Sequence, residues 1–468
     1  MSSADRAGGA ALDPVDRHEE ALAELGERIE DVIRSRDLTS LQAELEDLHP
    51  SDIADLLEAL ETDEERVWVL SALPASVASE TLVEMDESDE RTELLASMDP
   101  NLSAELLQEM ADDDAADLIA ALEPEEQARV LAAFPEEEAG DLRELLSYAE
   151  DTAGGIMTTW LVAVLQNLTA GEALTEVRRQ GREIEDEFYT VFVVDGEGRL
   201  TGILPLYDLV LAEPDVTLTD LAEPATVAVS PDTDQEEVGR LFARYNLAAM
   251  PVVDAEGVLL GRITFDDIID VIEEEQTEDI LRLAGTSDAE ELRGGWLDAV
   301  RSRLPWLALN LFTAMVAASV VYYFQATIEA VVILAAIMPI IAGMGGNAAT
   351  QALAVTVRRI AVSDGPLDDN RGAVAKEMVV GLANGAVLAS LAALLATYLP
   401  GGNGQLGLVV LMAMWGNIVV AGFAGAFIPT VLDRFGIDPA VASSVFVTTL
   451  TDLCGFFLLL GLASSFLL

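Results

Sequence analysis

The hydrophobic pattern of the chain changes once, near residue 300. After this point five long apolar stretches follow one another, separated by short polar connections; they cover residues 304–324, 329–357, 374–399, 406–432 and 440–466. Each reaches the roughly 20 residues that an α-helix needs to cross a bilayer. The pattern therefore predicts a five-helix transmembrane domain over residues 301–468, embedded in the lipid bilayer and preceded by a large soluble part.

The positive charges around these stretches predict their orientation. The Lys and Arg residues after residue 300 lie before the first stretch, between the second and third, or between the fourth and fifth, and the other two connections carry none. Basic residues favour the cytoplasmic side of a membrane. We therefore expect a multi-pass protein of the plasma membrane with a cytoplasmic N-terminus and an outer C-terminus.

A first internal repeat organises the start of the soluble part. Pro50, Pro74, Pro100 and Pro124 each open a similar helical phrase, with a second helical phrase between them. Proline suits the first turn of a helix, where its missing N–H is not needed. Paired short helices in tandem predict a small α-solenoid over residues 1–148; an irregular helical bundle is the alternative.

A second repeat follows, in which residues 188–210 match residues 247–269. Each copy has the pattern of a strand, a glycine-containing turn, a strand and a helix. The pair resembles tandem CBS domains, an α/β module that often binds adenine nucleotides. The resemblance places the first domain at residues 149–211 and the second at residues 212–275.

The second copy contains the sequence GRITFDD, which matches the Gly-x-Ile-Thr-x-x-Asp pattern of CBS domains. The resemblance makes Thr264 and Asp267 the nucleotide-facing positions, so ATP is a candidate ligand. The first copy has Pro205 where the hydroxyl residue should be. The simpler alternative is that Thr264 only caps the following helix.

The acidic charge of the chain has a general explanation. The net charge is −58, and only one of the 25 basic residues is a lysine, Lys376. This composition is typical of salt-loving organisms, in which surface carboxylates keep proteins hydrated. Acidic runs such as Asp112–Asp114 are therefore expected to be hydrated surface. The lack of a basic patch argues against nucleic acid as a partner.

The order of the parts resembles the MgtE family of magnesium channels along nearly the whole chain. Three sequences carry the resemblance in the membrane part: MPIIAGMGGNAATQALAVTVRRIA, KEMVVGLANG and DRFGIDPAVASSVFVTTLTDLCG. The resemblance implies a homodimer whose pore lies between the two membrane domains. It also implies a connecting or plug helix, at residues 276–300, that closes the pore when cytosolic Mg²⁺ is plentiful.

Asp452 is the one charged residue inside the last apolar stretch. An ionised carboxylate in a bilayer costs about 3 kcal/mol or more, so it usually faces a bundle interior or a water-filled path. In a homodimer two such carboxylates would face one Mg²⁺ ion, and the matching family position is the pore ion site. A protonated side chain that hydrogen-bonds between helices is the alternative.

Other polar residues of the apolar stretches are candidates for the same path. Thr448 lies one helical turn before Asp452, and Asn347 and Gln351 lie one turn apart in the second stretch. Asn384 and Asn417 are weaker candidates. Each amide has the alternative role of joining helices by a hydrogen bond.

Family resemblance also predicts a set of carboxylates that bind regulatory Mg²⁺ between the CBS pair and the connecting helix. They are Asp267, Asp270, Glu275, Glu278, Asp279, Asp234 and Glu236. In a chain this acidic, the alternative is that they are hydrated surface only.

Two other functions remain open at the level of sequence. One is a proton-coupled divalent-cation transporter that uses Asp452 as a relay, and the other is a membrane-tethered nucleotide sensor. An enzyme is not expected, because the only histidines, His18 and His49, lie near the N-terminus and no nucleophile–base pair is apparent.

Overall fold

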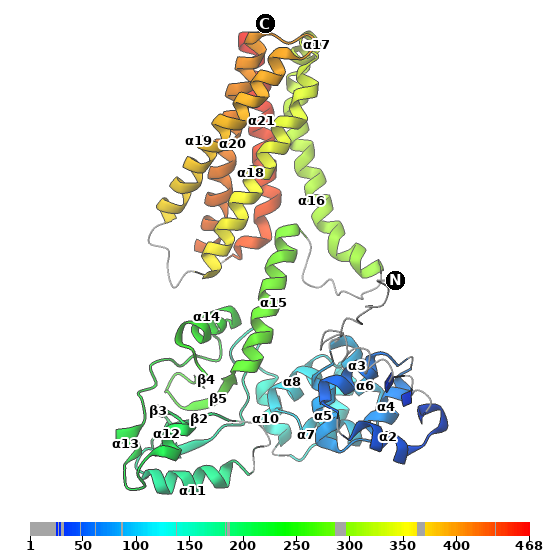
Figure 1. Ribbon diagram of the computed structural model, residues 1–468, viewed down its shortest axis with the longest axis vertical. Helices are drawn as coiled ribbons and strands as arrows, with labels where there is room; N and C mark the ends of the chain where they lie inside the picture. The colour runs from blue at the N-terminus through cyan, green and yellow to red at the C-terminus, as the bar shows by residue number, and fades with distance from the viewer. Residues whose placement is uncertain are drawn as a thin grey trace, which may run out of the picture. The chain divides into compact units, whose positions relative to one another are not determined.

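Figure 1 shows the computed structural model of the chain. It describes residues 25–285 and 296–468, apart from residues 27, 30–31, 47, 61, 86–87, 137, 183, 185–187, 363–369 and 436. The chain divides into two compact units, Met1–Val271 and Ile272–Leu468, and each is described by itself. Residues 286–295 of the predicted connecting helix lie outside the described residues.

The first unit begins with short helices that confirm the predicted solenoid. Their bounds are α2 (Leu38–Leu45), α3 (Pro50–Glu58), α4 (Asp63–Leu70), α5 (Ala75–Val83), α6 (Ser88–Ser97), α7 (Pro100–Gln108), α8 (Asp112–Ala120), α9 (Pro124–Leu131) and α10 (Glu138–Leu145). Helices α3, α5, α7 and α9 stack in one row, and α4, α6, α8 and α10 stack in a second row.

The repeated prolines and leucines explain this stacking. Pro50, Pro100 and Pro124 occupy the first turn of their helices, and Pro74 lies directly before α5. Equivalent leucines of successive repeats fill the space between the helices, because Leu57, Leu82 and Leu107 are each at most 1% exposed. Each repeat thus buries its apolar face against its neighbours.

The rest of the first unit has the two predicted α/β copies. The elements are β1 (Ala163–Leu165), α11 (Ala170–Gln180), β2 (Thr190–Val194), β3 (Leu200–Pro205), α12 (Leu206–Leu211), α13 (Leu218–Leu221), α14 (Gln235–Tyr245), β4 (Ala249–Val253) and β5 (Leu259–Thr264). Strand β2 pairs with β1 in parallel and with β3 antiparallel, and β4 pairs with β5 antiparallel.

The two copies repeat in register as well as in sequence. Phe192 faces Ile203 in the first hairpin, and the equivalent Pro251 faces Arg262 in the second. The turns use Gly198 and Gly257 at φ +82° and +84°, a backbone conformation that favours glycine.

Helix α15 (Phe265–Ala284) follows β5 directly and continues for 20 residues. It therefore joins the last helix of the second CBS copy to the first part of the predicted connecting helix without a break. Gly285, at φ +79°, follows its last residue.

The second unit contains the five predicted apolar helices and one short helix. The bounds are α16 (Trp296–Tyr323), α17 (Gln325–Ala330), α18 (Leu334–Val362), α19 (Asn370–Tyr398), α20 (Gly404–Arg434) and α21 (Pro439–Phe466). All five long helices are long and apolar enough to cross a membrane. The second begins at Leu334 rather than at residue 329, because α17 precedes it as a separate helix.

Helix α20 forms the centre of this unit. It packs against α18, α19 and α21, and it is the most buried of the five long helices, whereas α16 is the least buried. Small residues such as Ala413, Ala421 and Ala424 are fully buried along it and allow the neighbouring helices to approach closely.

Candidate ion path and metal-sensing sites

Asp452 lies on α21 and lines a cavity of about 560 Å³ beside α16 and α17. Its side chain is half-buried. Small residues of α16, Ala314, Ala317 and Ala318, form one wall, and Glu329 of α17 lies at another. The structure therefore places the one charged side chain of α21 at a cavity rather than in the packed interior of the helix bundle.

The other predicted path residues do not gather around Asp452. The hydroxyl of Thr448 donates a hydrogen bond to the carbonyl oxygen of Val445 at 3.2 Å, so it serves its own helix. Asn347 and Gln351 share one face of α18, as their spacing predicts, and both are exposed in the single chain. Neither amide lines the cavity that contains Asp452.

The two weaker candidates differ from each other. Asn384 is exposed on α19, whereas Asn417 is completely buried on α20 and donates to a carbonyl of α18. For Asn417 the alternative of a hydrogen bond between helices is therefore correct. Thr451 is also completely buried, beside Asp452. Nothing in the sequence distinguishes it from its threonine neighbours.

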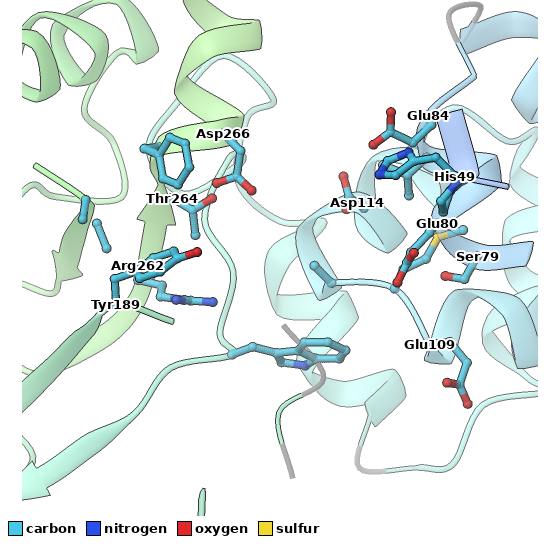
Figure 2. A pocket seen from close by; sticks show the side chains of 18 residues that line it. His49, Ser79, Glu80, Glu84, Glu109, Asp114, Tyr189, Arg262, Thr264 and Asp266 are labelled. Atoms are coloured by element: carbon cyan, nitrogen blue, oxygen red, sulfur yellow. The ribbon is translucent and has the colours of Figure 1, made fainter. Parts of the chain in front are cut away.

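A second cavity, of about 530 Å³, lies inside the first unit between the solenoid and the second CBS copy (Figure 2). The solenoid contributes His49, Glu80, Glu84, Glu109 and Asp114 to its lining. Strand β5 and the start of α15 contribute Arg262, Thr264 and Asp266 on the opposite side. Five carboxylates and one guanidinium thus surround the same space, an arrangement that favours cations.

Asp112 joins the solenoid to the CBS part next to this cavity. Its carboxylate accepts a hydrogen bond from the Thr158 hydroxyl at 2.5 Å and from the Thr159 N–H at 3.0 Å, and it also accepts one from the Thr159 hydroxyl. Thr158 in turn exchanges two backbone hydrogen bonds of 2.9 Å with Arg262 of β5. Asp112 therefore fastens the first turn of α8 to the segment that borders the second CBS sheet.

The neighbouring Asp113 and Asp114 correct the expectation that this acidic run is hydrated surface. Burial raises the pKa of Asp114 to about 7, with further contributions from the charges of Asp267, Asp117 and Asp266. Burial also raises the pKa of Asp113 well above its usual value, helped by the charges of Asp114 and Asp267. The protein therefore places several carboxyl groups close together here, where burial and the neighbouring acids make the ionisation of each one less favourable.

Thr264 and Asp267 are bound to each other. Both the N–H and the hydroxyl of Thr264 donate to the same carboxylate oxygen of Asp267, the N–H at 3.2 Å. This contact joins the side chains of Thr264 and Asp267 at the start of α15, and both the nucleotide-facing role and the capping role of Thr264 stay predictions. The Asp267 carboxylate nevertheless remains close enough to Asp113 and Asp114 to raise the pKa of both.

Three further predicted carboxylates lie near the end of α15, in the second unit. Arg282 forms ion pairs with Glu278 of the same helix and with Asp438, which caps the N-terminus of α21. Burial raises the pKa of Asp279 to about 6, and the charges of Asp438 and Glu275 add to the effect. Leu283 packs against Leu353, Val357 and Ala440 at the same place.

The remaining predicted sensor residues lie elsewhere. Asp270 is exposed on α15. Asp234 caps α14 by accepting from the N–H of Glu236 at 2.9 Å, and both side chains are exposed. Within the described part of the chain, no three acidic, histidine or cysteine side chains are arranged closely enough to hold a metal ion. The predicted acids lie mainly in two groups, one around Asp114 and Asp267 and one around Asp279. Neither group is a complete set of metal ligands in the described part of the chain.

The arrangement defines a class of protein: a multi-pass membrane protein with a CBS-containing soluble part and a carboxylate in its membrane bundle. Family comparison agrees with this class over most of the chain. A divalent cation transporter model matches residues 338–462, an MgtE intracellular N domain model matches residues 48–151, and a CBS domain model matches residues 153–215 and 218–274.

Relatives cover nearly the whole length. The chain is 36% identical over 441 residues to the magnesium transporter MgtE of Thermus thermophilus, covering 93% of this chain and 97% of that protein. It is 31% identical over 440 residues to the magnesium transporter MgtE of Bacillus subtilis, with 94% and 97% covered. The chain belongs to the MgtE family, which consists of transporters rather than enzymes.

Solved structures resemble the first unit. The cytosolic domain of the Mg²⁺ channel MgtE in complex with ATP is 36% identical, with a TM-score of 0.50, and the match covers 53% of this chain and 99% of that one. The soluble part of a magnesium transporter is 31% identical with the same TM-score, and 54% and 99% are covered.

Proposed function

We propose that this protein carries Mg²⁺ into the cell through a channel formed by a homodimer, with Asp452 of each subunit at the ion site. The observation that carries the proposal is the position of Asp452: it is the one carboxylate within the apolar part of α21, and it lines a cavity. The full-length similarity to proteins named magnesium transporters supports Mg²⁺ as the ion.

The chemistry of Mg²⁺ fits a site with few direct ligands. Mg²⁺ gives up its water reluctantly and is usually held through water by one or two carboxylates. One Asp452 per subunit and a two-fold axis would supply two negative charges. Thr448, Asn347 and Gln351 are expected to contact the hydrated ion only after two subunits associate, because they do not line the cavity of the single chain.

The gate follows from the crowded carboxylates of the soluble part and of α15. When Mg²⁺ is scarce, the negative charges of Asp114 and Asp267 repel one another, as do those of Asp279 and Asp438. Bound Mg²⁺ would bridge such carboxylates and hold α15 in a closed arrangement. A shift of a two-state gate from 1:99 to 99:1 needs about 5.5 kcal/mol, which several ions can share.

High salt would restrict how this gate can sense Mg²⁺. If the cytoplasm contains molar salt, as the acidic composition suggests, the Debye length is about 3 Å. Diffuse attraction between Mg²⁺ and the acidic surface is then almost fully screened. Sensing therefore requires direct or water-bridged contact with defined oxygens, including those of Asp270 and Glu275.

ATP is a secondary ligand in this proposal. The cavity between the solenoid and the second CBS copy has room for a nucleotide, and Arg262 and Tyr189 line it. Its carboxylates would repel the phosphates of free ATP, so we expect a nucleotide to bind only together with Mg²⁺. The ATP complex of the similar cytosolic domain supports this expectation.

The orientation is part of the same proposal. The basic residues next to the apolar helices favour a cytoplasmic N-terminus and an outer C-terminus. Mg²⁺ sensing by α15 would then report the concentration inside the cell.

Purified protein in liposomes tests the proposal. We expect Mg²⁺ to enter down its gradient and to give single-channel currents. When the pH on the sensing side is held constant, the flux should not depend on the proton gradient. The alternative of a proton-coupled transporter, for which Asp452 is also suitably placed, predicts slow flux that follows the proton gradient and no resolvable single-channel events. Liposomes that pass no Mg²⁺ in either condition would refute both.

A further inference from the structure

Asn417 occupies the point where three membrane helices meet. It lies in the middle of α20 and is completely buried. Its Nδ2 donates a hydrogen bond to the carbonyl oxygen of Ile341, on α18, at 3.1 Å. Its Oδ1 has no hydrogen-bond partner among the described residues, although it is buried as deeply as the rest of the side chain.

Two glycines make room for this amide. A Cβ atom placed on Gly345 of α18 would lie 2.2 Å from Nδ2 of Asn417, and one placed on Gly455 of α21 would lie 2.8 Å from it. Real Cβ atoms do not approach other atoms so closely. The side chain of Asn417 therefore packs directly against the backbones of α18 and α21 at these two glycines.

The contact determines the direction of Asp452. Thr451 is completely buried at the same junction, and its Cβ lies 3.5 Å from a Cβ placed on Gly345. Because successive residues of an α-helix are about 100° apart around the axis, burying Thr451 turns Asp452 out of the three-helix contact. Asp452 accordingly lines the cavity beside α16.

We propose that Asn417 is a positioning residue for ion transport: its amide fixes α21 against α18 and thereby directs Asp452 into the ion path. The inference rests on the proposed function of Asp452. The buried Oδ1 supports it, since an apolar side chain of the same shape would avoid leaving an acceptor without a donor. An amide at this place therefore serves something other than packing.

Asn417→Leu tests the inference, because leucine has nearly the same shape and no amide. Asn310→Leu is the matched control: it is the same change in another membrane helix, at an exposed asparagine of α16 that does not line the Asp452 cavity. Mg²⁺ uptake into liposomes is measured over a range of Mg²⁺ concentrations, and thermal unfolding is measured on the same preparations. We expect Asn417→Leu to lower uptake at least tenfold and to raise the half-saturating Mg²⁺ concentration, with an unchanged melting temperature. Asn310→Leu should leave all three quantities unchanged.

A second variant covers the case in which Asn417→Leu fails to fold. Gly455→Ala leaves Asn417 in place but pushes its amide away from α21, so the same rise in half-saturating concentration is expected. Unchanged uptake in both variants, or a loss that follows the amount of folded protein, would overturn the inference. An equal loss in Asn310→Leu would overturn it too. Asp452→Asn, measured in parallel, tests the proposed function separately, because it removes the charge without touching the three-helix contact.

Discussion

Carboxylates removed from bulk water, fully or in part, occur in two opposite settings in this protein. Asp452 is the single charged group of an apolar helix and faces a cavity. Asp113 and Asp114 lie in a soluble junction where burial and the charge of Asp267 raise the pKa of each. The first setting isolates one charge, whereas the second crowds several charges together.

The difference teaches what each setting can do. An isolated carboxylate in an apolar bundle has no substitute, so a function that needs its charge is lost completely without it. A crowded group contains redundant charges, so the loss of one member changes how strongly a cation is bound. We therefore expect all-or-none effects in the membrane unit and graded effects in the soluble unit.

Asp452→Asn should have the largest effect of any single change. The substitution keeps the shape and removes the negative charge that offsets the partial dehydration of Mg²⁺, so we expect the Mg²⁺ flux to fall roughly a hundredfold or more. Flux into liposomes is the measurement. Asp433→Asn, at an exposed position near the end of α20, is the control and should transport normally. Wild-type flux in Asp452→Asn would remove the distinction between the two settings.

Asp114→Asn or Asp267→Asn should change regulation by a smaller amount. Loss of one bridging carboxylate is expected to reduce about tenfold the ratio of channel current without cytosolic Mg²⁺ to current with it, while the maximal current remains. Patches bathed in molar KCl on the cytosolic side provide the measurement. Glu125→Gln removes an exposed acid of the solenoid and should not alter the ratio. Equal responses in all three variants would mean that only total charge matters.

Arg282→Gln should have a weaker effect on the same ratio. Arg282 is a permanent cation between Glu278 and Asp438, so closure at this place depends less on Mg²⁺ than closure at the Asp114 junction. Ion pairs of this exposure contribute up to about 1 kcal/mol. We therefore expect about threefold more Mg²⁺ to be needed for half-maximal closure. A shift to lower Mg²⁺ would show instead that Arg282 competes with Mg²⁺ for the carboxylates.

The pKa of Asp114 predicts the smallest, local effect. A carboxyl group with a pKa of about 7 when folded and near 3.9 when unfolded binds a proton more tightly in the folded protein, so the junction loses stability as pH rises from about 4 to about 7. The amides around α8 should therefore have lower protection factors, which correct the exchange rates for their intrinsic pH dependence, at pH 7.5 than at pH 5.5 without Mg²⁺. Asp114→Asn should flatten this dependence, and added Mg²⁺ should reduce it. Identical protection factors at both pH values would contradict the assignment.

A feature of this protein could be predicted from the sequence when its residues differ clearly from the residues around them. The five membrane helices, the proline-led solenoid and the two equivalent hairpins follow from local periodicity, and the structure contains all of them. Asp452 could be recognised because it interrupts an apolar run. Asp113 and Asp114 could not, because one acidic run in an acidic domain looks like another, and their burial depends on a contact with residues about 150 positions away.

The contacts between particular membrane helices could not be predicted from the sequence either. Asn347, Gln351 and Asn417 are all amides in apolar helices, and their spacing says which share a face but not what that face meets. Only the packing of α18, α20 and α21 separates the buried Asn417 from the exposed Asn347 and Gln351. The sequence left a nucleotide-facing role and a helix-capping role open for Thr264, and its hydrogen bonds to the Asp267 carboxylate became visible only in the structure.

The contact made by Asp112 has a practical consequence for dissecting this protein. A fragment that begins at residue 149, where the first CBS domain is predicted to start, would keep Thr158 and Thr159 but lose the carboxylate that binds both. The segment beside β5 would then be held mainly by its two backbone hydrogen bonds to Arg262. The solenoid and the CBS pair are consequently best expressed as one piece, and the isolated pair is a poor surrogate for ligand screening.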